Sequence, residues 1–275
     1  MTLFQKQSAY GLGDIGAFGA SMLAGKLGGG AAVSGLSHLL TEEGRGMGHT
    51  SPQRVQALLD QVRAEHDLDV GYEHAPEIVG SNAGYMRPGV PEKIVGDLRK
   101  ALDDPKSKVP GSKTYIHPTE RRQYSRMIAK LEGASRPGGL VLTGTHFKKP
   151  GTVEHELGHA IAGSRGNILE RAATNTEADP FYYHTLPSYL AAFLGARKGS
   201  PLMGAVAGGL TGLATSAPTL YAEYAANRYG DQLLDPAEKD KHGKWKGYGT
   251  YLAGAGIPAA LTGALYGLFR RKMKI

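Results

Sequence analysis

Two long stretches of this sequence contain no charged side chain, and they set its architecture more than any other feature. Gly199–Ala222 runs for 24 residues and Gly247–Phe269 for 23 without Asp, Glu, Lys or Arg. As a helix, each is about long enough to cross a bilayer. Small residues also recur four apart, at Gly204 and Gly208 and at Gly263 and Gly267. Because such spacing favours close helix contacts, we expect tightly packed apolar helices, in a membrane bundle or in the interior of a large protein.

The start of the chain has a similar character. Ile15–Leu40 is small and apolar, interrupted only by Lys26 and His38. We expect a pair of packed helices hinged at the Gly28–Gly30 run, because glycine weakens a helix interior. The sequence thus predicts three regions: an apolar helical segment 1–41, a soluble α+β core 42–180 that carries the metal site, and an apolar helical region 181–275.

The central region contains recognisable helix and strand signals. Ser51 is a good N-cap before a proline, and apolar residues then recur at helical spacing, which predicts a helix over 52–65. Two further helices are expected at 91–103 and 119–131. The apolar run in Gly139–Phe147 predicts a strand, which could pair with an extended peptide at its edge. The predicted fold class is mainly α with a small β-sheet.

The absence of cysteine limits the chemistry. Without cysteine, the chain has no disulfide framework, thiolate zinc finger, iron–sulfur cluster or cysteine nucleophile, so a metal site must use His, Asp and Glu. The net charge of +7 favours anionic surfaces such as lipid head groups or nucleic acid. No specific nucleic-acid site is predicted, because the basic pairs are not interleaved with aromatic residues. These pairs are Arg121-Arg122 and Lys148-Lys149.

Residues 155–159 read His-Glu-Leu-Gly-His and match the H-E-x-x-H pattern. Residues four apart lie one turn apart on one face of a helix, so His155 and His159 can reach a single Zn²⁺. Glu156 lies about 100° round the helix from His155. It is therefore placed to act as a general base on a water at the metal rather than as a ligand. Gly158 is expected to keep the space beside the metal open.

Three acidic residues compete to be the third protein ligand. Glu223 lies in a helix-compatible stretch, and Asn227, one turn later, could orient a histidine ligand through its other ring nitrogen. Glu177 and Asp179 follow the motif at a shorter distance, but Pro180 biases Asp179 away from helix. We expect Glu223 to be the third ligand, with Glu177 or Asp179 as the alternatives.

The motif, the apolar segments after it and the stretch Glu223-x-x-Ala226-Asn227-Arg228 together resemble the gluzincin metallopeptidases of the HtpX and CAAX prenyl protease group. The resemblance covers Gly139–Tyr229. In that group the motif is followed by a Glu-x-Glu-Ala-Asp signature whose first Glu is the third zinc ligand. The resemblance implies a zincin-like metallopeptidase core with zinc as cofactor, ligands His155, His159 and Glu223, and Glu156 as the base. The chain departs from the signature at Ala225, where the group has its second Glu, and at Asn227, where it has Asp.

A shared metal restricts how the apolar segments can meet a membrane. His159 and Glu223 must lie on one side, so the chain between them crosses an even number of times or not at all. Phe181–Ala196 is about 16 residues, short for a span, so a hairpin that is buried or dips into one leaflet is expected there. The candidate spans are 247–269 and 15–40, with the basic cluster of Arg270, Arg271, Lys272 and Lys274 on the cytoplasmic side. We expect membrane association with the active site facing the cytoplasm; a virion is the alternative location.

These features predict a zinc-dependent endopeptidase that acts on a peptide or protein substrate. The candidate stabilisers of the tetrahedral oxyanion are His184, Arg228 and Tyr229, together with Tyr182 and Tyr183. The alternative is a structural or membrane-penetrating assembly protein, for example a virion-associated ejection protein, because nearly half of the chain is predicted to be small apolar helix. A homo-oligomer is compatible with either function.

Overall fold

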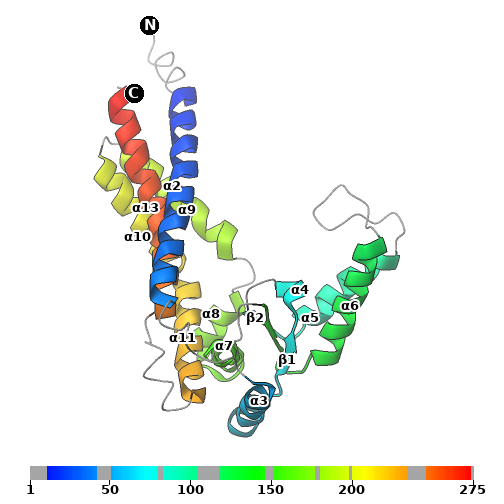
Figure 1. The fold of residues 1–275 in the computed structure, drawn as a ribbon. Coiled ribbons are helices and arrows are strands. Elements are labelled where there is room, and N and C mark those ends of the chain that lie inside the picture. Colours follow the sequence, from blue (N-terminus) through cyan, green and yellow to red (C-terminus); the bar gives the residue numbers. More distant parts are fainter. Residues whose placement is uncertain are drawn as a thin grey trace. The chain divides into compact units, whose positions relative to one another are not determined.

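The computed structural model describes residues 11–41, 51–79, 83–103, 118–145, 151–176, 180–197, 200–234 and 246–273. It is mostly helical with one three-stranded sheet, which confirms the predicted mainly α class (Figure 1). The chain forms two compact units. The helical unit comprises Met1–Arg45, Asn175–Tyr221 and Gly243–Ile275, and the sheet unit comprises Gly46–Thr174 and Ala222–His242. This division differs from three consecutive regions, because the apolar ends of the chain associate with each other and residues 222–242 return to the sheet unit.

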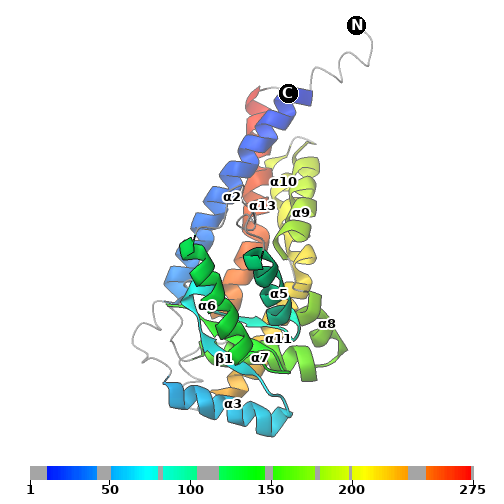
Figure 2. The same cartoon turned by 90° about the vertical axis from the view of Figure 1, so that its right-hand side faces the viewer.

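The helical unit contains four long helices that lie side by side in Figures 1 and 2. They are α2 (Gly11–Thr41), α9 (Pro180–Arg197), α10 (Pro201–Thr215) and α13 (Lys246–Met273), and α13 contacts the other three. Among the described residues, one segment, Leu252–Lys272, is long and apolar enough to cross a membrane.

Glycines in this unit serve helix packing. The predicted hinge at Gly28–Gly30 is wrong, because α2 runs through it without a break. A Cβ on Gly29 would lie only 2.8 Å from the Cα of Pro258, so this glycine lets α13 approach. The predicted close contacts at the four-residue spacing are confirmed, since a Cβ on Gly263 would lie 2.2 Å from the carbonyl oxygen of Gly204.

The sheet has the strand order β1-β3-β2, with β1 (Gly71–His74) parallel and β2 (Ala83–Met86) antiparallel to β3 (Leu140–Thr143). The predicted strand in Gly139–Phe147 is confirmed as β3, over fewer residues. Its expected role as a free edge for a peptide is wrong, because β3 is hydrogen-bonded on both sides and β2 is an edge strand. Sequence reasoning missed β1 and β2.

Helices cover both faces of β3. Val141 packs into a core formed with α3 (Pro52–His66) and α7 (Thr152–Arg165), while Leu140 and Leu142 pack into a second core formed with α5 (Val90–Asp103) and α6 (Pro118–Ala134). All of β3 is therefore buried, as expected for a continuous apolar run. Three shorter or flanking helices complete the described elements: α4 (Pro76–Val79), α8 (Ile168–Thr176) and α11 (Ala217–Leu233).

The helix over 52–65 is confirmed as α3, and its start follows the predicted chemistry. Ser51 Oγ accepts the N–H of Arg54 at 3.1 Å, and Pro52 occupies the first turn. The helices expected at 91–103 and 119–131 are confirmed as α5 and α6.

Candidate metal centre

The motif residues lie on α7, which is held firmly in the sheet unit. Val153, Leu157 and Ile161 of α7 are buried in the core with α3 and β3. The helix starts after Gly151, whose N–H donates to Oε2 of Glu154 at 2.8 Å. It ends at Gly166, whose N–H donates to the carbonyls of Ala162 and Ile161. The helix predicted around the motif is thus confirmed.

Two glycines allow α7 and α11 to touch through their backbones. A Cβ on Gly158 would lie 2.0 Å from the carbonyl oxygen of Ala226, and a Cβ on Gly230 would lie 2.8 Å from that of Glu154. The expectation that Gly158 leaves space open beside a metal is therefore wrong, because the backbone of α11 occupies that space. This close approach brings Glu223 against both histidines and Asn227 against His155.

The structure brings the three favoured ligands together. Nε2 of His155 lies 3.2 Å from Oε2 of Glu223, and Nε2 of His159 lies 3.6 Å from Oε1 of Glu223. One potential ligand atom from each residue falls within 4.8 Å of the others. Ligands at about 2.0–2.1 Å in a tetrahedron are about 3.3 Å apart, so these separations suit a single small ion. The three residues could hold a metal ion; the alternatives Glu177 and Asp179 lie outside the described residues.

The unused ring nitrogens of the two histidines differ in their surroundings. Nδ1 of His155 lies 2.9 Å from Oδ1 of Asn227, as the sequence analysis expected of an orienting amide. When this Nδ1 carries its proton and donates to Asn227, Nε2 is left to face Glu223. Nδ1 of His159 is buried and has no hydrogen-bond partner among the described residues.

Without a metal, the three residues form a charged cluster. Burial alone would lower the pKa of His155, but hydrogen bonds and charges from Glu223, Glu156 and Asn227 raise it to about 9. Burial would raise the pKa of Glu223, but the two histidines lower it to about 2. The site therefore contains an imidazolium paired with a carboxylate at neutral pH. A metal cation can replace the proton in such a pair.

Glu156 is placed to exchange a proton. Its side chain is only 8% exposed, and burial raises its pKa, opposed in part by the charges of His155 and His159. The backbone N–H of Tyr85 on β2 donates a hydrogen bond to this carboxylate. Tyr85 itself is held by its hydroxyl, which donates to the carbonyl oxygen of Gly138 at 2.8 Å. No local pattern predicts this contact, because it links residues more than 70 positions apart.

Two of the candidate oxyanion residues, Arg228 and Tyr229, interact with Glu170. Arg228 contacts Oε1 of Glu170 at 2.8 Å, and the Tyr229 hydroxyl donates to Oε2 of Glu170 at 3.2 Å. Arg228 also lies over the ring of Tyr229. His184 lies in α9, and its side chain is outside the described residues, as are those of Tyr182 and Tyr183. A role for any of them at an oxyanion stays a prediction.

Glu170 joins α8 to α11, and sequence reasoning missed it. It is almost fully buried and accepts the N–H of Asn167 at 2.8 Å, while Asn167 Oδ1 accepts the N–H of Glu170. This reciprocal pair is a capping box. The spacing Asn-x-x-Glu before an apolar helix was the signal that could have identified Glu170.

Ala225 is fully buried in α11, so a glutamate at this position would need different packing. Asn227 presents an acceptor to His155, but as a neutral amide it adds no negative charge.

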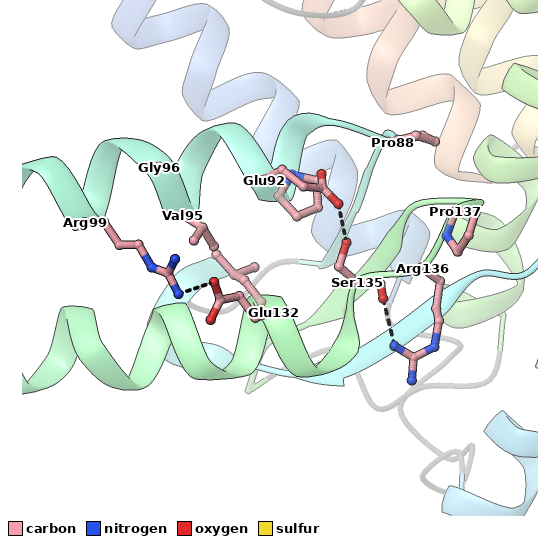
Figure 3. Close-up of a pocket in the computed structure, with 11 residues that line it drawn as sticks. Pro88, Glu92, Val95, Gly96, Arg99, Glu132, Ser135, Arg136 and Pro137 are labelled. Atoms are coloured by element: carbon pink, nitrogen blue, oxygen red, sulfur yellow. Dashed lines mark hydrogen bonds and ion pairs between the residues drawn. The ribbon is translucent and has the colours of Figure 1, made fainter.

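A groove of about 700 Å³ lies between α5 and α6. None of the candidate metal ligands lines it. Figure 3 shows that its polar groups pair with one another across the groove. Arg99 contacts Glu132 at 2.6 Å, and the Ser135 hydroxyl donates to Glu92 at 2.9 Å. The polar groups of these four residues are therefore paired with one another. They offer little to a ligand in the groove.

Comparisons with models of protein families, with curated proteins and with solved structures found no match.

Proposed function

We propose that this chain is a zinc-dependent endopeptidase with a gluzincin-like site. One observation carries the proposal: His155 and His159 on α7 and Glu223 on α11 converge on one point, with the buried carboxylate of Glu156 next in sequence to the first histidine. Two imidazoles and one carboxylate are the protein ligands of several catalytic zinc sites, in which a fourth position stays open for water or substrate.

The buried ligand atoms support this choice of cofactor. Oε2 of Glu223 is fully buried and faces Nε2 of His155 at 3.2 Å, and a cation between these atoms would interact favourably with both. Nitrogen and carboxylate donors are typical of zinc. Zinc bound here would lower the pKa of a water and polarise the scissile carbonyl.

Glu156 would move the protons of the reaction. Because burial raises its pKa, the carboxylate is a stronger base than an exposed glutamate and can take a proton from the attacking water. The same group can then donate that proton to the amide nitrogen that leaves. Asn227 would hold the ring of His155 in one orientation throughout.

The substrate is proposed to be an extended peptide that lies along β2. This strand is at the edge of the sheet, and Tyr85, in its middle, donates its N–H to Glu156. An extended chain added beside β2 would therefore pass close to the proposed base. The arrangement favours an endopeptidase, because an edge strand can bind the middle of a chain.

We further propose that the protein is attached to a membrane through Leu252–Lys272 of α13, which is long enough to span. The alternative is an assembly protein, with a virion location, that keeps the metal helix without hydrolysis. The two functions differ in whether they need Glu156.

The variant Glu156→Gln tests the function. We expect it to retain about one zinc per chain, measured by plasma mass spectrometry, and to lose cleavage of unfolded casein, followed by mass spectrometry of the fragments. Glu132→Gln, at an exposed position on α6, is the matched control and should cleave like the wild type. Equal cleavage by wild type and Glu156→Gln would refute the peptidase.

A further inference from the structure

The helical unit has small side chains inside and large apolar side chains outside. Its buried positions carry mainly Gly, Ala, Ser and Thr, for example Ser21, Ala192, Ala196, Gly204, Gly208 and Thr262. Among the described residues of the four long helices, Tyr266 is the large buried exception, and it contacts the rings of Phe18 and Phe193. A water-soluble bundle normally has the opposite pattern, because burial of large apolar side chains drives its folding.

Each of the four helices presents large apolar side chains outward. On α9 the exposed residues are Leu186, Leu190 and Leu194, and on α10 they are Leu202, Met203, Val206 and Leu210. On α2 they are Met22, Leu23 and Leu27, and on α13 they are Leu252, Leu261, Leu268 and Phe269. Their exposed fractions run from 36% to 73%. Because all four helices contribute, this surface is not a single patch such as a protein partner would cover.

Two buried hydroxyls inside the unit are satisfied by their own helices. The Ser21 hydroxyl donates to the carbonyl of Ala17 at 2.7 Å, and the Thr262 hydroxyl donates to that of Pro258 at 2.9 Å. Hydroxyls bonded one turn back, close glycine contacts and prolines inside helices are all tolerated in hydrocarbon, where no water is available to backbone groups. Both α9 and α13 contain such a proline, Pro187 and Pro258.

Apart from Lys26 and Lys246, the charged residues of the four helices lie at one end: Asp14 of α2, Arg197 of α9, and Arg270, Arg271 and Lys272 of α13. Arg270 donates to the carbonyl of Arg197, so the ends of α9 and α13 meet there. Arg271 and Lys272 follow, and the sequences of α9, α10 and α13 contain no acidic residue. This basic end is complementary to anionic head groups. Within the apolar part of α2, Lys26 is exposed, and its long side chain can reach toward the head groups.

From these observations we infer that the helical unit spans a lipid bilayer as a whole, with α2, α9 and α10 in contact with acyl chains as well as α13. Helices of 18 and 15 residues are about 27 and 22 Å long at 1.5 Å per residue. Local bilayer thinning accommodates such lengths. The α9–α10 pair is then a transmembrane hairpin rather than one that dips into a single leaflet, and it meets the even-crossing requirement for His159 and Glu223.

The helix directions determine which end joins the sheet unit. Pro201 of α10 packs on Gly267 of α13, and Gly212 packs on Ala255, so α10 is antiparallel to α13. By the same kind of contact, α2 is antiparallel to α13, and α9 is antiparallel to α10. The basic end therefore holds the start of α2 and α10 and the end of α9 and α13. Every chain segment that leads to the sheet unit leaves from the other end.

The metal ligands consequently lie on the side of the membrane opposite the basic end. Basic clusters next to spans favour the cytoplasmic side, which assigns the sheet unit to the non-cytoplasmic side. This result differs from the sequence expectation of an active site facing the cytoplasm. The reason is that α13 crosses once between Lys246, which follows the sheet unit in the sequence, and its basic C-terminal turn.

Lipid contact can be measured directly because the chain has no cysteine. Leu27→Cys, Leu190→Cys and Leu210→Cys are each labelled with a small fluorophore and reconstituted in phosphatidylcholine–phosphatidylglycerol vesicles that carry nitroxides on the acyl chains. We expect at least half of the fluorescence to be quenched at all three positions and none at Ala57→Cys, which is exposed on α3. Circular dichroism checks that each variant keeps its helices. Quenching at only one helix or at none, as for a surface covered by a second copy, overturns the inference.

Sidedness is tested in the inner membrane of a bacterial host with a membrane-impermeant maleimide. We expect Ala57→Cys to react in spheroplasts and Lys272→Cys, at an exposed position, to react only in inverted vesicles. Reaction of both positions from the same side would overturn the assignment. Neither experiment depends on peptide hydrolysis, so both can fail or succeed independently of the proposed enzyme.

Discussion

The affinity of the chain for zinc should rise steeply with pH until about pH 9. The pKa of His155 is raised to about 9, chiefly by Glu223, whose Oε2 lies 3.2 Å from its Nε2. A metal binds only the neutral imidazole, so this proton must leave when zinc binds. Glu223, with a pKa of about 2, is ionised across the whole range and adds no slope.

The magnitude follows from the position of the pKa. Removing a proton at pH 7 from a group with a pKa of 9 costs about 2.7 kcal/mol, because each pH unit corresponds to about 1.4 kcal/mol. The apparent dissociation constant at pH 7 should therefore be about 100-fold weaker than the constant above pH 9. Between these values it should change about tenfold per pH unit.

Competition with a chromophoric zinc chelator, corrected for the chelator's own protonation, measures this dependence from pH 6 to 10. Calorimetry in buffers of different ionisation enthalpy should detect about one proton released per zinc at pH 7.5. Asn227→Ala is an internal check, because the hydrogen bond with Asn227 raises the pKa of His155. In this variant, the plot of zinc affinity against pH should level off at a lower pH than in the wild type. A wild-type affinity that is flat between pH 7 and 9 would refute the charged pair.

Four further outcomes are expected. Gly158→Ala places a Cβ 2.0 Å from the backbone of α11 and should weaken zinc affinity at least tenfold in a competition titration. Gly133→Ala is the control, because a Cβ there meets nothing within 4 Å. This control should keep the zinc affinity and raise the free energy of unfolding by about 0.5–1 kcal/mol. Asn227→Ala should weaken zinc affinity about 10- to 100-fold at pH 9.5; unchanged affinity would mean that the amide does not orient the ligand. Glu170→Ala should lower the free energy of unfolding by about 1–3 kcal/mol in urea, because it strips a buried acceptor from the start of α8. The metal-free protein should lose up to about 3 kcal/mol of its free energy of unfolding as pH rises from 6.5 to 9. The raised pKa of His155 stabilises the fold fully below pH 6.5, and this contribution is lost as pH rises to about 9. His155→Gln should abolish that loss.

Local signals identified α3 and the motif helix α7. A Ser-Pro cap and a 3.6-residue period are properties of adjacent residues, so α3 was predictable over almost its full length. The H-E-x-x-H spacing fixes two side chains on one helix face whatever the rest of the fold does. The position of Glu223 could not be predicted from local signals alone, because its place opposite the histidines depends on a contact between α7 and α11, whose facing residues His155 and Asn227 are 72 positions apart.

Non-local features were harder to predict. Strands β1 and β2 are four residues each and only partly buried, so they lack the alternation or continuous apolar run that identifies a strand. The Gly28–Gly30 run predicts a hinge when α2 is considered alone, but opposite Pro258 it is a packing surface. The same reason explains Gly158, whose neighbour Ala226 comes from another part of the chain.

The zinc-edge anomalous map of a crystal grown with zinc tests the central claim most directly. A single peak should lie about 2.0–2.2 Å from Nε2 of His155, Nε2 of His159 and a carboxylate oxygen of Glu223. No peak at this position, or a peak held by the two histidines with Glu177 or Asp179 in place of Glu223, would contradict it.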